Sequence, residues 1–456
     1  MTALWPGRGG PAIDYISAPP PEALAAIRPR RVILLGSTGS IGRNALAVAE
    51  ASGGGLEVAG LACARNVELL AAQARRHRPG VLAVLDDAAA EALRGLLPTG
   101  YSPRILTGRE GYARLAALDG AQAVLPAQAG AAGLTATLAA ALSGKMVCLA
   151  NKESLVLAGG LVRALCAGTG AAVLPVDSEH DALFQCVAGR GQEVKSLVLT
   201  ASGGPFRGRK AGELATVTPE AALAHPNWRM GAKISIDSAT MMNKGLELME
   251  AVHLYGVAPE RVRILVHPQS VVHSLAEFAD GSFMAQLGAA DMRLPIGHCL
   301  DWPVCAGRGA PALDLAAVGN LTFEEPDPEV FPCLRLAREA LVADLAAGGG
   351  AGFGPACVAL NAANEAAVEL FLKGGCGFTD IPALVAAALA ALPGLAEARA
   401  LSPLPGSLPA ELPAAPLDEA GAAGLALTLA ARVDALDRVC RALVRRRAAH
   451  PEEPKC

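Results

Sequence analysis

Two carboxylates separated by one residue follow an apolar run, in the segment Pro175-Val-Asp177-Ser178-Glu179-His180. If the backbone there is extended, the side chains of Asp177 and Glu179 leave the same face. Two carboxylates that close repel each other unless a cation or a proton lies between them. Oxygen ligands of this kind suit Mg²⁺ or Mn²⁺. A helix capping box from Ser178 to Asp181 is an equally good interpretation of the same residues.

A third carboxylate, Glu247, ends the polar run 237–247. It follows Lys244 by three residues, so the two would share one face of a helix. The same run contains Ser238 and Asn243, which together with Lys244 are the side-chain types that an anion pocket needs. The alternative is an exposed salt bridge between Lys244 and Glu247, which would contribute little energy.

Two loops could complete such a pocket. The Gly-rich loop 201–206 contains Ser202, whose hydroxyl could donate a hydrogen bond to a phosphate. The segment 225–231 places Trp228 between a proline and a glycine, which favours a lid over a small ligand. Burial of Trp228 in the core is the alternative.

A glycine-rich turn follows the first apolar run of the chain. Residues 32–35 lead into Gly36-Ser-Thr-Gly39-Ser-Ile-Gly42. A strand that enters a helix through such a turn lets backbone N–H groups approach a pyrophosphate. The position directly after a strand favours a dinucleotide site over an ordinary glycine-rich turn.

The second expected strand discriminates between the two nicotinamide cofactors. An NAD site usually has an acidic residue about 20 residues beyond the glycines, to bind the ribose 2′-hydroxyl. Here Arg65 stands in that region instead. A guanidinium can pair with a 2′-phosphate, so Arg65 favours NADP(H) as the cofactor. The alternative is that Arg65 is a surface arginine without a role in binding. Short-chain dehydrogenase chemistry is disfavoured, because no lysine lies four residues after any of the tyrosines at 15, 101, 112 and 255.

The apolar runs predict the elements that must position these side chains. Between residues 31 and 176, short continuous apolar runs alternate with Ala-rich segments, as in a parallel, doubly wound sheet. The expected strands are residues 32–35, 56–61, 81–85, 121–125, 146–149 and 172–176. Farther along, strands at 197–200, 234–236, 262–266 and 283–287 indicate an α+β region with a mixed or antiparallel sheet. Helices are expected from about residue 331, most clearly at 425–447.

We therefore expect an α/β protein with an N-terminal Rossmann-like NADP-binding domain, a central α+β catalytic domain and a C-terminal α-helical domain. The predicted boundaries are an N-terminal extension at 1–30, an NADPH-binding domain at 31–177, a catalytic metal and substrate domain at 178–302, a linker at 303–330 and a helical domain at 331–456. The extension is expected to be frayed and without a role. Residues 393–416 are a Pro-rich insertion between helices.

Composition excludes several classes of function. The 456 residues carry 39 basic and 43 acidic side chains, a net charge of −4, which is too balanced for a general nucleic-acid binder. The mean hydropathy is +0.36, but the best candidate membrane span, residues 121–144, is mostly Ala with Pro, Gly and Thr. The N-terminus resembles neither a signal peptide nor a transit peptide. With 11 scattered cysteines expected to be reduced, we predict a cytoplasmic protein that binds neither nucleic acid nor membrane.

Taken together, these motifs closely resemble the 1-deoxy-D-xylulose 5-phosphate reductoisomerase family. The similarity extends from about residue 31 to the last helix. The matching motifs are Gly36-Ser-Thr-Gly-Ser-Ile-Gly42, Ala150-Asn-Lys-Glu153, Val176-Asp-Ser-Glu-His180, Ser202-Gly-Gly-Pro-Phe206, His225-Pro-Asn-Trp228, Lys233-Ile-Ser-Ile-Asp-Ser-Ala-Thr-Met-Met-Asn-Lys-Gly-Leu-Glu247, His267-Pro-Gln-Ser270 and Leu360-Asn-Ala-Ala-Asn-Glu365.

The resemblance implies a role for each matching residue. NADPH would be held by Thr38, Gly39, Ser40, Ile41, Ala64, Arg65, Asn66, Asn151, Glu153 and Gly231. The metal, Mg²⁺ or Mn²⁺, would be bound by Asp177, Glu179 and Glu247, which together with Lys152 would be catalytic. The substrate would contact Lys152, Ser178, Glu179, Ser202, His225, Ser238, Asn243, Lys244 and Glu247, with Met292 nearby and Trp228 on the closing loop.

The resemblance also implies the reaction. A retro-aldol and aldol rearrangement of 1-deoxy-D-xylulose 5-phosphate would give an aldehyde, and NADPH would reduce it to 2-C-methyl-D-erythritol 4-phosphate, a step of isoprenoid biosynthesis by the non-mevalonate route. Family members form homodimers. Two alternatives are a metal-free reductase of a phosphorylated aldehyde and a catalytically inactive NADPH-binding regulator. The second should have lost part of the acidic triad or Lys152, and this sequence has them all.

Overall fold

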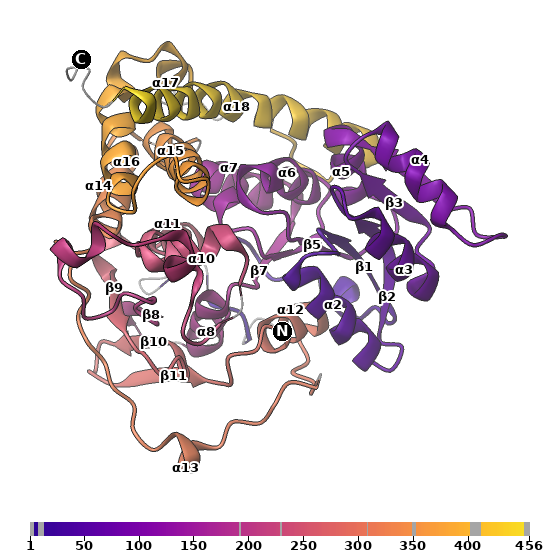
Figure 1. Cartoon of the computed structure of the whole chain (residues 1–456). Coiled ribbons are helices and arrows are strands. Elements are labelled where there is room, and N and C mark those ends of the chain that lie inside the picture. Colours follow the sequence, from indigo (N-terminus) through magenta and orange to yellow (C-terminus); the bar gives the residue numbers. More distant parts are fainter. Residues whose placement is uncertain are drawn as a thin grey trace.

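The larger of two sheets has seven parallel strands in the order β4-β3-β2-β1-β5-β6-β7 (Figure 1). The computed structural model describes residues 4–7, 13–190, 193–228, 230–307, 309–348, 353–401 and 412–450. The strands are β1 (Arg30–Leu35), β2 (Leu56–Ala62), β3 (Val81–Val84), β4 (Arg104–Thr107), β5 (Ala123–Pro126), β6 (Met146–Leu149) and β7 (Ala172–Pro175). This sheet confirms the predicted Rossmann-like α/β fold. Sequence analysis missed β4, an edge strand with no fully buried residue.

Helices cover both faces of this sheet. They are α1 (Glu22–Ala26), α2 (Ser40–Ala51), α3 (Val67–His77), α4 (Asp87–Leu96), α5 (Gly108–Ala116), α6 (Leu134–Leu142) and α7 (Glu153–Thr169). The turn from β1 into α2 requires glycine. Gly36 has a φ of +82°, and a Cβ at that position would lie 2.6 Å from the carbonyl oxygen of Ala127. Only glycine tolerates both conditions.

The smaller sheet has four strands in the order β11-β10-β8-β9. The strands are β8 (Val194–Ala201), β9 (Val262–Val266), β10 (Val272–Phe278) and β11 (Phe283–Leu287). Strands β8 and β9 are parallel, whereas β10 is antiparallel to both β8 and β11. The mixed sheet confirms the predicted α+β region, although β10 was not predicted.

The strand predicted at 234–236 is wrong, because these residues lie in helix α10 (Ala232–Ala239). Three residues that alternate between apolar and polar are too few to separate a strand from a helix. The buried residues of this helix are Ser235, Ile236, Asp237 and Ala239, and the apolar pair Ile236 and Ala239 is three residues apart, as on one face of a helix. This matters for function, since α10 follows the expected lid and carries Ser238.

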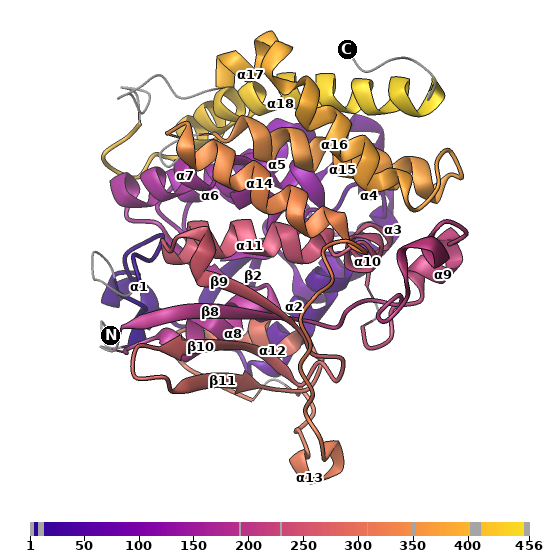
Figure 2. The same cartoon turned by 90° about the vertical axis from the view of Figure 1, so that its left-hand side faces the viewer.

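Helix α11 (Met242–Tyr255) is buried on all sides and contacts both the small sheet and helix α7. The neighbouring helices are α8 (Ser178–Val187), α9 (Pro219–Leu223) and α12 (Arg293–Asp301). After α12 the chain forms an extended arm that carries the short helix α13 (Leu315–Val318) away from the body (Figure 2). The arm returns at Glu324, which forms a β-bridge with Val266.

The C-terminal region is helical, as predicted, with α14 (Pro332–Ala346), α15 (Pro355–Leu372), α16 (Asp380–Ala391), α17 (Ala396–Leu401) and α18 (Glu419–Ala449). Helix α18 extends across α5 and α6 of the first sheet (Figure 1). Glu419, in its first turn, pairs with Arg104 at 2.5 Å and with Arg114 at 3.0 Å. Residues 402–411 of the Pro-rich insertion lie outside the described residues. Beyond them, Leu417 donates its N–H to the carbonyl of Leu142.

The expectation that residues 1–30 are frayed is wrong for the described part of that segment. Trp5 and Tyr15 are almost fully buried, and the Trp5 ring makes edge contacts with Tyr15, Phe184 and Trp302. Residue 16 donates its backbone N–H to the carbonyl of Leu254 at 2.7 Å. The physical reason is burial of aromatic surface, which stabilises this segment against α8 and the ends of α11 and α12.

Among the described residues, no helix combines the length and the apolar character that crossing a bilayer requires. The ten described cysteines are all free thiols. Eight of them are buried, while Cys376 is partly exposed and Cys305 is exposed. The prediction of reduced cysteines is therefore confirmed for these ten.

Candidate active site

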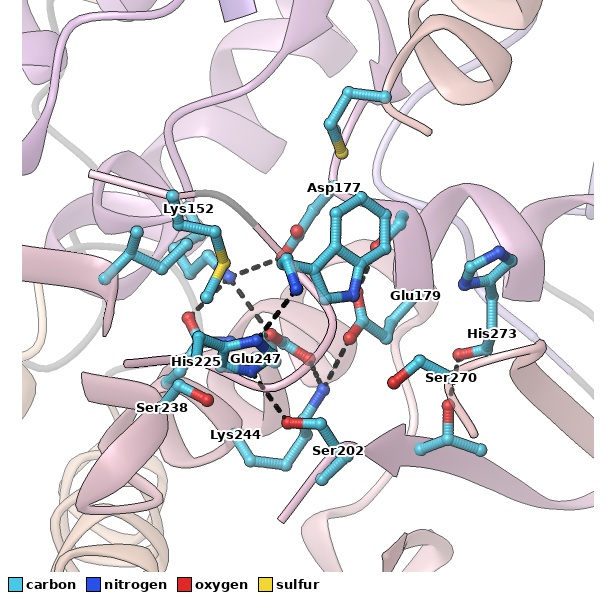
Figure 3. A pocket seen from close by; sticks show the side chains of 18 of the residues that line it. Lys152, Asp177, Glu179, Ser202, His225, Ser238, Lys244, Glu247, Ser270 and His273 are labelled. Carbon is cyan, nitrogen blue, oxygen red and sulfur yellow. Dashed lines mark hydrogen bonds and ion pairs between the residues drawn. The ribbon is translucent and has the colours of Figure 1, made fainter. Parts of the chain in front are cut away.

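A cavity of about 200 Å³ brings together most of the predicted site residues (Figure 3). Its walls come from the start of α2, from the segments that follow β6, β7 and β8, from the loop before α10, and from α10 and α11. The strand ends of the large sheet therefore face the small sheet across the cavity. In open α/β sheets, ligands bind at the carboxyl ends of the strands, where this cavity lies.

The three predicted carboxylates converge in this cavity. Asp177, Glu179 and Glu247 each present an oxygen within 4.8 Å of the oxygens of the other two. Asp177 is the N-cap residue of α8, yet its side chain makes no capping hydrogen bond. Its carboxylate instead faces Lys152. The capping-box interpretation is wrong, and so is the extended backbone, because Glu179 lies in the first turn of a helix.

Two buried lysines lie among the carboxylates. The ammonium of Lys152 lies 2.7 Å from Oδ2 of Asp177 and 3.1 Å from Oε1 of Glu247. The ammonium of Lys244 lies 2.8 Å from Oε1 of Glu179 and also contacts Glu247. Burial opposes the charged form of Lys152, but the surrounding carboxylates raise its pKa well above the usual value. Both lysines are thus held as cations.

Three carboxylates and two ammonium groups leave one formal negative charge in a buried site. Burial and the charge of Glu179 raise the pKa of Glu247 to about 7. A raised carboxylate pKa means that the negative charge is not fully compensated by the lysines, so an additional cation would stabilise the ionised form. Three carboxylate oxygens at this spacing fit a hard divalent cation such as Mg²⁺ or Mn²⁺. The donor set therefore agrees with the metal that sequence analysis predicts.

Ser202 and His225 are organised to donate a hydrogen bond into the cavity. Nδ1 of His225 accepts the backbone N–H groups of Asn227, at 3.2 Å, and Trp228, at 2.9 Å. Burial lowers the pKa of His225, so the neutral ring carries its proton on Nε2, which lies 2.9 Å from Oγ of Ser202. The N–H of Gly204 also donates to that oxygen. The hydroxyl hydrogen of Ser202 is then available for a ligand.

The remaining anion-binding candidates line the same cavity. Ser238 comes from α10, while Asn243 and Lys244 come from the first turn of α11. Oδ1 of Asn243 accepts a hydrogen bond from Lys152 at 2.9 Å, and its amide donates to Glu247. The structure thus places the expected phosphate-binding side chains directly beside the acidic triad.

The expected lid borders the cavity. Trp228 is half-buried and lines the cavity, so the alternative of a fully buried core tryptophan is wrong. Its ring centroid lies 6.2 Å from that of His273. The side-chain amide of Asn227 donates to Oγ of Ser270 at 2.7 Å, which ties the loop to the small sheet. Arg229, in the same loop, lies outside the described residues.

Seven of the ten expected cofactor residues lie at two places along the large sheet. Thr38, Gly39, Ser40 and Ile41 form the turn and the first residues of α2, and the last two also line the cavity. Ala64, Arg65 and Asn66 are exposed at the end of β2. Oδ1 of Asn66 accepts the N–H of Leu69, so its side chain caps α3.

Asn151 and Glu153, also expected at the cofactor, are buried in a network of hydrogen bonds. The amide of Asn151 donates to the carbonyls of Gln128, at 2.6 Å, and Gly130, at 2.9 Å. Glu153 pairs with Lys233 at 2.6 Å. Gly231, the N-cap of α10, is exposed and lines the cavity.

Several cavity residues were not assigned by sequence analysis. They are Ala150, Val176, Thr200, Ala201, Met230, Ile234, Met241, His267, Ser270, Val272 and His273. The motif 267–270 was recognised without a role. His273 lies on β10, the strand that was not predicted, so its approach to the cavity had no signal in the sequence. Met292, expected near the substrate, does line the cavity.

A Rossmann-like sheet whose glycine turn borders a cavity with three converging carboxylates defines the class of nicotinamide-dependent oxidoreductases that use a divalent metal. Family models narrow this class. The model of 1-deoxy-D-xylulose 5-phosphate reductoisomerase matches residues 32–159, and two models of C-terminal domains of that enzyme match residues 173–255 and 287–404.

Individual relatives agree with the family models. The reductoisomerase of Oleidesulfovibrio alaskensis is 57% identical over 378 residues, covering 83% of this chain and 91% of that protein. That of Nitratidesulfovibrio vulgaris is 58% identical, covering 83% of this chain and 90% of that protein. The chain belongs to the 1-deoxy-D-xylulose 5-phosphate reductoisomerase family.

Solved structures that resemble this chain belong to the same family. A DOX-P reductoisomerase in complex with NADPH, fosmidomycin and magnesium superposes with a TM-score of 0.81 at 38% identity, covering 93% of this chain and 99% of that chain. The reductoisomerase of Zymomonas mobilis in complex with NADPH gives a TM-score of 0.76 at 41% identity, covering 94% and 100%.

Proposed function

We propose that this protein converts 1-deoxy-D-xylulose 5-phosphate into 2-C-methyl-D-erythritol 4-phosphate with NADPH and a divalent metal, Mg²⁺ or Mn²⁺. The observation that carries the proposal is the approach of the Asp177, Glu179 and Glu247 oxygens to within 4.8 Å, in the cavity that Ser202 also lines. Family membership supports the same reaction. The activity would be a step of isoprenoid biosynthesis by the non-mevalonate route.

The phosphate of the substrate would be bound by Ser202, Ser238, Asn243 and Lys244, with His225 fixing the orientation of Ser202. These contacts lie away from the reacting carbons, so their binding energy can orient the substrate. Lys152 and Ser178 would contact the oxygen-bearing carbons, because both border the acidic triad. Trp228 would cover the site and exclude water from the rearrangement.

The metal, when bound, polarises the keto and hydroxyl oxygens of the substrate, and NADPH supplies the hydride that reduces the rearranged aldehyde. The residues of the chain would bind these groups and orient them toward the substrate. Asp177, Glu179 and Glu247 would bind the metal, and Lys152 would neutralise their excess charge. Thr38, Gly39, Ser40 and Ile41 would present backbone N–H groups to the cofactor phosphates, and Arg65 would bind the 2′-phosphate between Ala64 and Asn66.

A direct assay tests the proposal. Purified protein is mixed with 1-deoxy-D-xylulose 5-phosphate, NADPH and Mn²⁺, and NADPH oxidation is followed together with mass analysis of the product. We expect oxidation that depends on the sugar phosphate and stops after chelation of the metal. Undiminished turnover without metal would favour the alternative of a metal-free reductase. Binding of NADPH without any turnover would favour the regulator.

We also propose that residues 31–177, 178–302 and 331–456 act as the cofactor, catalytic and helical domains, joined by a linker at 303–330. The boundary between the first two falls at the start of α8, where Asp177 ends one segment and Ser178 begins the other. The free thiols of the described cysteines support a cytoplasmic location.

A homodimer is the proposed assembly. Strand β11 is an edge strand of the small sheet, and its residues Phe283 and Met284 are 49% and 37% exposed. On the arm, Leu315 and Phe323 are 58% and 41% exposed, and helix α13, which contains Leu315, lies away from the body (Figure 2). Exposed apolar side chains on an edge strand and an arm favour pairing with a second copy. Light scattering during size-exclusion chromatography should give twice the chain mass, and a monomer at micromolar concentration would contradict this.

A further inference from the structure

Helix α15 carries two buried asparagines, Asn361 and Asn364, and the partly buried Glu365, which the proposed reaction does not use. The carboxylate of Glu365 accepts the backbone N–H of Ala131 at 3.1 Å and the side-chain amide of Asn361 at 3.0 Å. It also pairs with Arg441 of α18. Ala131 belongs to the short 3-10 helix Gly130–Gly133, which follows β5. Glu365 thus binds the backbone of residues 130–133, at the end of β5 where the cofactor is proposed to lie.

That backbone segment contacts Asn151, one of the proposed NADPH residues. The carbonyl of Gly130 accepts the side-chain amide of Asn151 at 2.9 Å. Gly130 has a φ of +66°, and a Cβ there would lie 2.6 Å from Oε1 of Glu365. A Cβ at Gly133 would lie 2.6 Å from Cγ of Asn151. The 3-10 helix is therefore packed tightly between Glu365 on one side and Asn151 on the other.

The preceding residue, Asn364, holds the substrate side of the site. Its amide donates to Oδ1 of Asp237 at 2.8 Å, and both side chains are buried. Asp237 lies on α10, next to Ser238 of the proposed phosphate site, and pairs with Lys233 at 2.9 Å. Lys233 in turn pairs with Glu153, which accepts a hydrogen bond from Asn151. Two adjacent residues of α15 thereby contact two segments that flank the active site, residues 130–133 and helix α10.

We propose that Asn364 and Glu365 are positioning residues: Glu365 sets the NADPH site through the 130–133 backbone, and Asn364 sets the phosphate-binding helix α10. The inference rests on the proposed function for the identity of the two ligands. The N–H of Ala131 is partly buried, and a charge-assisted hydrogen bond to it contributes more than a neutral one would. Loss of the carboxylate removes this bond. The consequence is a displaced segment beside the cofactor rather than a lost contact to the cofactor.

The chain offers a matched control for Glu365. Glu369 lies one turn later on α15 and pairs with Arg445 of α18 at 3.2 Å, just as Glu365 pairs with Arg441. Glu369 is more exposed and also pairs with Lys373, within its own helix. A substitution of Glu369 therefore tests the loss of a pairing between α15 and α18 without touching the cofactor edge.

The first experiment measures the NADPH dissociation constant by cofactor fluorescence, without sugar phosphate, for Glu365→Leu, Glu365→Gln and Glu369→Leu. We expect about tenfold weaker binding for Glu365→Leu and about threefold for Glu365→Gln, which keeps an acceptor oxygen for Ala131. Glu369→Leu should stay within twofold of the wild type. Affinities within twofold of wild type for both Glu365 variants would overturn the proposal. If Glu365→Leu does not fold, the Glu365→Gln value alone decides.

The second experiment addresses Asn364 through the isosteric variant Asn364→Asp, which replaces the donor by a carboxylate facing Asp237. We expect the KM for the sugar phosphate to rise about fivefold while kcat changes less than threefold, because α10 moves and the reacting groups do not. Equal losses in kcat and in thermal stability with unchanged KM would overturn this role. The NADPH titration needs no turnover, so a wild type that binds NADPH but does not convert the sugar phosphate would refute the proposed function alone.

Discussion

The ammonium of Lys152 lies 3.1 Å from Oε1 of Glu247, although 95 positions separate the two residues in the chain. Lys152 caps α7 of the large sheet, and Glu247 lies in α11 beneath the small sheet. Both side chains are almost completely buried. A buried ion pair of this kind is sensitive to the loss of either partner, because the other charge would remain without compensation. The proposed metal site therefore depends on contact between a helix of the large sheet and a helix that packs on the small sheet.

Replacement of Glu247 by Gln should abolish most metal-dependent turnover. The change replaces one of the three carboxylates by an uncharged amide of nearly the same shape. We expect kcat to fall by about 100-fold or more, since even partners of metal ligands cost 10–100-fold in affinity. Steady-state rates across a Mn²⁺ titration measure this effect.

The control for Glu247→Gln is the affinity for NADPH, measured by fluorescence in the absence of metal. It should stay within twofold of the wild type, because all the proposed cofactor residues except Gly231 lie along the large sheet. An equal loss of cofactor affinity would contradict the separation of metal and cofactor sites.

Replacement of Arg65 by Asp should shift the cofactor preference toward NADH. Arg65 is exposed at the end of β2, where a guanidinium can reach a 2′-phosphate. A hydrogen bond between charged groups contributes about 1.5–3 kcal/mol, so NADPH affinity should fall about 10–100-fold. The ratio of kcat/KM for NADPH and NADH measures the shift.

The control is Arg75→Asp, which makes the same charge change in the last turn of α3 and should leave the ratio unaltered. Equal ratios for the two variants would show that Arg65 does not bind the 2′-phosphate.

Replacement of Trp5 by Ala should destabilise the folded protein. Trp5 is 3% exposed, packs against three aromatic rings and donates its Nε1 hydrogen to the carbonyl of Ser17. Large buried aromatics cost about 3–5 kcal/mol when reduced to alanine. Urea denaturation followed by circular dichroism gives the free energy of unfolding. Leu4→Ala, at an exposed neighbour, should cost less than about 0.5 kcal/mol. Equal effects of the two changes would mean that the N-terminal segment is not part of the core.

The stability of the protein should fall in mild acid partly because of His253. Burial, with a smaller contribution from Arg163, lowers the pKa of His253 to about 4. Between pH 4 and about 6.5 the unfolded chain therefore binds a proton that the folded chain does not, so stability falls as the pH falls through this window. From pH 7.5 to pH 5.0, wild type should lose about 2 kcal/mol more than His253→Gln.

The measurement for His253 is the free energy of unfolding by urea at both pH values, for wild type and variant. The difference between the two proteins cancels the carboxylates and other histidines that titrate in the same range. A difference that does not change with pH would show that His253 takes up its proton in the folded state without penalty.

The sequence predicted the parts of this protein that depend on local patterns. The glycine turn at 36–42 was recognisable because a positive φ and close backbone approach require glycine at fixed spacing. The parallel sheet followed from continuous apolar runs, which reflect burial on both faces. Strand β4 was not predicted, because this edge strand has no continuous apolar run. Helix α10 was wrongly predicted as a strand, because the alternation of Ile234 and Ile236 with a polar residue covers too few residues to distinguish the two.

The sequence by itself determined the chemistry: the types of residue that can bind a metal, a phosphate and a nicotinamide, and their order in recognisable motifs. The tertiary structure decided the rest. It placed Glu247 against Lys152, brought His273 to the cavity, buried Trp5, and joined Asn364 to Asp237. Contacts between residues far apart in the chain depend on how whole helices and sheets pack, and no short window of sequence contains that information.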